Sequence, residues 1–153
     1  MTYRETNISV SRGSSLLVLG YYLFNWMQMY QTQGLNSATI FRLWVIVIVA
    51  TIILNILGNI LTNIVLAIIH AIRTQSDKEP RFVEDERDRL IGLKGTQAAY
   101  IAFSAGVFLA MLTFALGQPP LVMFSLIIFF AIIAEIISDT LQLAFYRRGV
   151  QYG

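Results

Sequence analysis

Three long stretches without any charged side chain constrain this chain more than any other feature. Residues 13–41, 43–72 and 95–134 contain 29, 30 and 40 residues without Asp, Glu, Lys or Arg. A helix of about 20 predominantly apolar residues is long enough to cross a bilayer. Only 13% of the chain is charged, against about 25% in soluble domains. The pattern predicts an integral membrane protein and excludes a soluble domain, a nucleic-acid-binding protein and a disordered chain.

Breaker residues divide the apolar sequence into four expected spans. Gly34 lies in a short polar loop, and Gln118-Pro119-Pro120 interrupts the last stretch because proline has no amide hydrogen. The sequence therefore predicts an all-α fold, an integral membrane bundle of four transmembrane helices that forms a single domain over 1–153. The expected spans cover about 14–31, 40–72, 95–117 and 121–146, with a charged cytoplasmic segment at 73–94. This order is compatible with two tandem helical hairpins.

The distribution of basic residues predicts the orientation of the chain. Ten of the 11 Lys and Arg residues fall at the N-terminus, in the central segment or at the C-terminus, and only Arg42 lies on the opposite side of a four-span topology. Short loops rich in Lys and Arg face the cytoplasm. We therefore expect a multi-pass protein of the cell (plasma) membrane, with both termini cytoplasmic and the lipid bilayer as its first partner.

Polar residues recur at helical spacing in the second and fourth expected spans. Asn55 and Asn59 lie four residues apart, and Glu135 and Asp139 repeat that spacing 80 positions later. Such spacing places each pair on one helix face. At 1.5 Å per residue, Asn55 and Glu135 both fall near the bilayer midplane. We expect these four side chains to meet in one buried polar layer.

That layer has two interpretations. An ionisable group near the bilayer centre costs roughly 3 kcal/mol or more, and no basic residue is expected at the same depth. Glu135 would then be protonated, hydrogen-bonded to an amide, or paired with a bound cation. The layer is either a site for a proton, a cation or a substrate, or a set of hydrogen bonds that only holds the helices together.

A row of small residues follows the third expected span. Ala98, Ala102, Gly106 and Ala110 are spaced four residues apart. Such rows allow close helix–helix approach in membranes. We expect a packing seam, either within one chain or between copies in a homo-oligomer.

The central segment carries a dense run of mixed charge. It includes Glu84, Asp85, Arg87, Asp88 and Arg89. Acidic residues followed by basic ones suit the start of a helix, where the helix dipole favours anions. The run is either a docking surface for a cytoplasmic protein partner or a solvated helix extension.

This run also carries a resemblance. The stretch DERDRLIGLKG (85–95), followed by a hydrophobic hairpin that ends in AFYRRGV, resembles a family of small, uncharacterised bacterial membrane proteins with a D-E-R-D-x-x-I-x-x-K-G-like segment. The resemblance implies a four-span membrane protein, and it brings no catalytic residues.

Composition limits the chemistry further. The chain has no cysteine and one histidine, so we expect no cofactor, no metal site and no enzyme; acid–base catalysis by two carboxylates is the one enzymatic alternative. The function expected first is proton- or cation-linked transport by a small inner-membrane protein. The alternative is a membrane-embedded regulatory or scaffold protein whose cytoplasmic segment binds a soluble partner.

Overall fold

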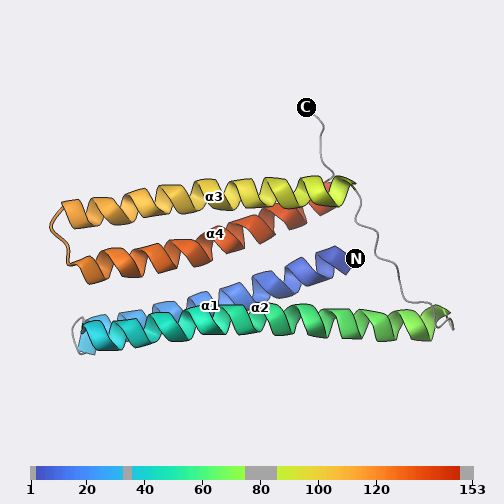
Figure 1. Cartoon of the computed structure of the whole chain (residues 1–153), viewed down its shortest axis with the longest axis horizontal. Coiled ribbons are helices and arrows are strands. Elements are labelled where there is room, and N and C mark those ends of the chain that lie inside the picture. The colour runs from blue at the N-terminus through green and yellow to red at the C-terminus, as the bar shows by residue number, and fades with distance from the viewer. Residues whose placement is uncertain (1–2, 33–35, 75–85, 149–153) are drawn as a thin grey trace.

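The chain folds into four long α-helices, which confirms the all-α prediction (Figure 1). The computed structural model describes residues 3–32, 36–74 and 86–148. The helices are α1 (Tyr3–Thr32), α2 (Ser37–Thr74), α3 (Glu86–Ala115) and α4 (Pro120–Arg148). All four extend beyond the expected spans at one end or both, and α1 begins 11 residues earlier than expected.

Local sequence sets where the helices begin and end. Asn36 caps α2, because its side-chain oxygen accepts a hydrogen bond from the amide of Ala38 at 3.1 Å. After α3, Gly117 adopts φ 89°, a conformation that glycine takes without steric cost. The amide of Gln118 then bonds the carbonyl of Thr113 at 3.1 Å, as in a glycine-terminated helix. Pro120 opens α4, where a missing amide hydrogen costs nothing.

The four helices form two antiparallel hairpins that lie side by side (Figure 1). The end of α1, the start of α2, the end of α3 and the start of α4 lie at the same end of the molecule, and the start of α1 and the end of α4 lie toward the other end. Helix α4 is central, since it packs along α3 and along α1 and touches α2. Among the described residues, no Cα of α3 comes within 8 Å of a Cα of α1 or α2.

The apolar core lies between α1, α2 and α4. It contains the buried side chains Val18, Tyr22, Leu43, Val47 and Ile132. Tyr22 is 2% exposed, and its hydroxyl donates to the carbonyl oxygen of Ser125 at 2.7 Å. This bond satisfies the polar end of a side chain whose ring is buried. The first hairpin is therefore joined to α4 by both packing and hydrogen bonding.

Three of the four helices are candidate membrane spans. Within the described residues, segments in α2, α3 and α4 are long and apolar enough to cross a bilayer. Helix α1 is long enough but is not a candidate, so the predicted count of four spans is not established. The apolar part of α1 is short, because Asn25 and Gln28 interrupt it toward one end and Ser11, Arg12 and Ser14 precede it.

Helices α3 and α4 approach most closely where α3 has small residues. Gly106 and Ala110 are buried, whereas Ala98 and Ala102 are half-buried. A Cβ atom added at Gly106 would overlap the side chain of Phe130 on α4. At Gly95, a Cβ would lie 2.6 Å from Gln142. The seam therefore joins helices within one chain.

Replacing Gly106 by leucine should separate these helices. The new side chain has to displace Phe130, and overpacking of this kind costs about 1–3 kcal/mol. We expect Gly106→Leu to lower the thermal unfolding temperature of the purified protein in detergent. The matched control is Ala105→Leu, which places the same leucine side chain at the neighbouring exposed position. Equal stability of the two variants would contradict the tight contact.

Candidate functional site

A chain of hydrogen bonds links α1, α2 and α4 near the middle of the bundle. The side-chain amide of Asn55 donates to a carboxyl oxygen of Glu135 at 3.0 Å. The hydroxyl of Ser11 lies 3.2 Å from the amide oxygen of Asn55 and donates to it. Asn55 thus uses both ends of its amide, as acceptor and as donor. The structure brings together these two predicted residues, which are 80 positions apart in the sequence.

Asp139 lies one turn from Glu135 and faces α1. It is 8% exposed, and it interacts with the hydroxyl of Ser11 and, through space, with the charges of Arg12 and Glu135. Its oxygen Oδ2 is buried and has no hydrogen-bond partner among the described residues. The Nε of Arg12 is likewise buried without a partner there. An unsatisfied carboxylate oxygen in a buried position is costly, so a proton, a water molecule or a ligand that reached this atom would reduce that cost.

A polar cavity of about 360 Å³ opens onto Asp139. All four helices contribute to it, and its polar lining comes from Asn7, Ser11, Asn59, Thr96, Asp139 and Gln142. Asn59 is exposed as a residue but lines this cavity. To hold a water molecule, a cavity needs several polar groups and enough room, and this cavity has both. It reaches Asp139 directly and Glu135 only through Ser11 and Asn55.

Sequence reasoning missed the contribution of α1. The N-terminal residues were expected to lie before the first span, but α1 begins at Tyr3 and carries Arg12 into the bundle. We expected no basic residue at the depth of Glu135; the structure places Arg12 within electrostatic range of Asp139, one turn from Glu135. A signal was present: Asn7, Ser11 and Ser15 repeat the four-residue polar spacing of α2, which marks one helix face.

The charged segment is only partly described. Glu84 and Asp85 lie outside the described residues. Asp88 accepts a hydrogen bond from the hydroxyl of Tyr146 on α4 at 2.7 Å, so this carboxylate already has an intramolecular partner. Arg87 and Arg89 are exposed on the first turns of α3.

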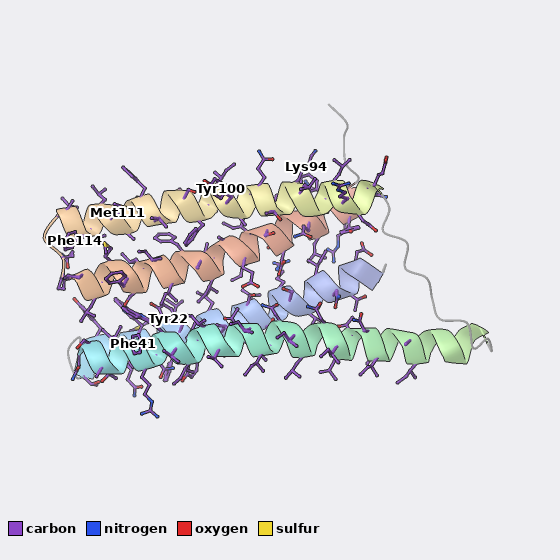
Figure 2. All side chains as sticks on the ribbon, viewed as in Figure 1. Tyr22, Phe41, Lys94, Tyr100, Met111 and Phe114 are labelled. Carbon is purple, nitrogen blue, oxygen red and sulfur yellow. The ribbon has the colours of Figure 1, made fainter. Side chains whose placement is uncertain are left out.

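Nearby, Lys94 also makes an intramolecular contact. Its ammonium lies over the ring of Phe145 at 5.4 Å from the centroid, within the range of a cation–π interaction. Toward this end of α3 (Figure 2), contacts with α4 therefore occupy part of the charged segment. Within the part of the chain that the structure describes, no cluster of His, Cys, Asp and Glu could hold a metal ion.

The electrostatic link between Arg12 and Asp139 can be tested by a double-mutant cycle. Arg12→Gln removes a cation within electrostatic range of the buried carboxyl of Asp139. Leaving a buried polar group without its partner costs about 1–3 kcal/mol, and a charged group costs more. We expect both Arg12→Gln and Asp139→Asn to destabilise the protein at neutral pH, and the double variant to lose less than the sum of the two. Strict additivity, measured by unfolding in detergent, would show that the two groups do not interact.

Compared with protein-family models, curated proteins and solved structures, the chain gives no significant match. The interpretation of the site therefore rests on its own residues. These are a hydrogen-bonded pair, Asn55 and Glu135, and a buried carboxylate, Asp139, that faces Arg12 and opens into a polar cavity.

Proposed function

We propose that this chain is a small polytopic inner-membrane protein that carries out proton- or cation-linked transport through its carboxyl and amide layer. The observation that supports this most is the polar cavity that reaches Asp139, whose oxygen Oδ2 has no partner among the described residues. Glu135 lies one turn before Asp139 on α4 and is hydrogen-bonded to Asn55. A proton or cation that enters the cavity therefore meets two carboxyl groups in succession.

The same geometry speaks against a purely structural polar layer. Polar side chains that only hold membrane helices together use their atoms on one another. Asn55 and Glu135 fit that description, but Asp139 does not, because its Oδ2 has no partner among the described residues and the residue lines the cavity. Intramembrane carboxyl groups that face a water-filled cavity mark ion or proton pathways in other membrane proteins. The cavity is thus the feature that favours transport over a scaffold.

The proposal includes four spans, with α1 crossing the membrane as part of the bundle. Helix α1 runs antiparallel to α2 and packs against both α2 and α4 (Figure 1). Its most polar side chains do not have to face lipid, because Asn7 and Ser11 line the cavity and Arg12 acts on Asp139. The mean hydropathy of α1 therefore counts polar side chains that would not contact lipid, so it underestimates the ability of this helix to cross a bilayer.

The location and the relatives of the chain belong to the same proposal. Arg12, Lys94, Arg147 and Arg148 lie toward the end of the bundle opposite the two hairpin loops, which favours a plasma-membrane protein with that end cytoplasmic.

Asn63 is exposed on α2, and a second copy in a homo-oligomer would cover its amide. We also propose that the chain belongs to the family of small bacterial membrane proteins that its DERDRLIGLKG stretch resembles.

Cysteine labelling tests the topology, because the natural chain contains no cysteine. In cells, an impermeant thiol reagent should modify single cysteines placed at Asn36 and Gln118, and it should not modify one placed at Arg148. A cysteine at Thr2 decides whether α1 crosses. Protection of Thr2→Cys together with labelling of Asn36→Cys supports four spans. Labelling of both would place the two ends of α1 on the same side and contradict the proposal.

Proton movement in liposomes tests the function. The purified chain is reconstituted with a pH-sensitive dye inside, and gradients of Na⁺, K⁺ and an organic cation are imposed in turn. We expect at least one gradient to change the internal pH faster than in empty liposomes. Glu135→Gln should abolish the change, because an amide cannot exchange a proton in this pH range.

The matched control is Glu86→Gln, which removes an exposed carboxyl at the start of α3. It should retain the flux of the unmodified protein. Flux that persists in Glu135→Gln would contradict the role given to this residue. No flux under any gradient, with a correctly folded protein, would favour the alternative of a regulatory or scaffold protein.

A further inference from the structure

An apolar groove runs along α4, between α2 and α3, with Glu135 at its floor. One hollow of about 450 Å³ lies between α3 and α4, and a second of about 270 Å³ lies between α2 and α4. The two share Ala131 and Glu135, so they adjoin along α4, and we refer to them together as the groove. Tyr100 and Phe103 of α3 line one half. Tyr100 lies about midway along α3 (Figure 2).

The groove exists because the bundle is asymmetric around α4. Helix α1 packs against both α2 and α4 and so closes one side of that pair. Helix α3 packs on α4, but among the described residues its backbone stays more than 8 Å from α2. The other side of α4 is therefore left open along the hollow between α2 and α3. In a bilayer, this opening faces the hydrocarbon.

The lining of the groove determines what could bind there. Apart from Glu135, its walls are mostly aliphatic and aromatic side chains. The described contacts of Glu135 include one hydrogen bond from Asn55 and no bond from a basic side chain. A carboxylate in apolar surroundings gains most from a positive charge brought to it. The site is thus complementary in charge to a cation and complementary in polarity to an apolar molecule.

A small inorganic cation fits this lining poorly. Hard divalent cations require about six or more oxygen ligands, and the hydroxyls of Thr51, Thr96, Tyr100 and Ser138 are spread over both halves of the groove. An organic cation needs no such shell, because its own apolar substituents contact the walls. Aromatic rings such as those of Tyr100 and Phe103 also attract organic cations through their faces.

We propose that the groove binds a hydrophobic monovalent cation, of the quaternary ammonium or phosphonium class, with Glu135 as its counter-ion. The proposal rests on the transport function proposed above and names its substrate class. The volume of the larger hollow lies within the range of about 300–1,000 Å³ that is usual for small-molecule sites. The open side of the groove lets an apolar cation enter from the bilayer rather than from water.

The groove adjoins the polar cavity, which supplies a route for release. Thr96 lines both the larger hollow of the groove and the polar cavity, and Asp139 of the cavity lies one turn from Glu135 on α4. A proton that reaches Glu135 from the cavity neutralises the counter-ion, and one monovalent cation then leaves. Charge balances in this exchange, because one proton replaces one positive charge. The two chambers therefore suit an exchange of protons for hydrophobic cations.

Binding of tetraphenylphosphonium to the full chain tests this proposal directly. Equilibrium dialysis is performed on the protein in lipid nanodiscs, with empty nanodiscs as the reference for partition into lipid. We expect saturable binding that triphenylphosphine oxide, a neutral molecule of similar shape, does not displace. Glu135→Gln should weaken the affinity about tenfold or more, since the counter-charge is lost. Glu86→Gln should leave the affinity unchanged.

A second pair of variants tests the aromatic wall. Phe103→Ala should weaken binding about fivefold, because it removes a ring that lines the groove. Phe108→Ala removes an exposed ring of α3 outside the groove and should have no effect. Circular dichroism and the elution volume in detergent verify that each variant remains folded. Equal affinities of Phe103→Ala and Phe108→Ala would overturn the assignment of the groove.

The remaining outcomes separate this proposal from the transport function. Binding that is equal in Glu135→Gln and the natural protein, or no greater than in empty nanodiscs, would overturn the substrate class. If Na⁺ or K⁺ still drives Glu135-dependent proton flux, the transport function stands without this substrate class.

Ala131→Cys tests whether a second copy fills the groove. A disulfide-linked dimer that forms in high yield, with no phosphonium binding before cross-linking, would identify a second copy as the occupant.

Discussion

The structure depends on satisfying polar side chains inside a bundle whose outer surface is apolar. In hydrocarbon, each unpaired polar group is unfavourable in free energy, because no water molecule is present to hydrogen-bond it. The bond between Asn55 and Glu135 meets this requirement across α2 and α4, the pair of helices with the least backbone contact among those that touch. Ser11 extends the bond to α1. Three helices are thus joined by hydrogen bonds near the middle of the bundle.

Not every polar atom of this hydrogen-bonded layer has a partner among the described residues. Asp139 has a nearby cation in Arg12, yet one of its oxygens remains without a partner among the described residues. The cavity beside it is lined by all four helices. A polar layer that only stabilised the bundle would gain from closing this space. The proposed transport function gives a role to a carboxyl group beside a cavity, because a group that binds and releases a proton or cation has to be reachable.

The position of α4 explains why two chambers of opposite character lie next to each other. One face of α4 carries Asp139 toward α1 and the polar cavity, and the adjacent face carries Glu135 toward α2 and the apolar groove. Residues four apart on a helix are neighbours with slightly different directions. The two hairpins do not pack symmetrically. Helix α1 of the first hairpin contacts α4 of the second, but among the described residues α3 of the second hairpin does not contact α2 of the first. The groove is the result of that missing contact.

The sequence by itself determined the all-α class, the approximate positions of the helices along the chain and the common level of Asn55 and Glu135. Uncharged runs report burial in lipid, and counting residues along a helix gives depth, so Asn55 and Glu135 could be placed at one level. Only the tertiary structure decided which helices are neighbours. Periodicity defines a face but not its partner, so the groove could not be predicted. The same limit applies to Arg12, because the sequence alone did not show that α1 begins at Tyr3 and brings Arg12 within electrostatic range of Asp139.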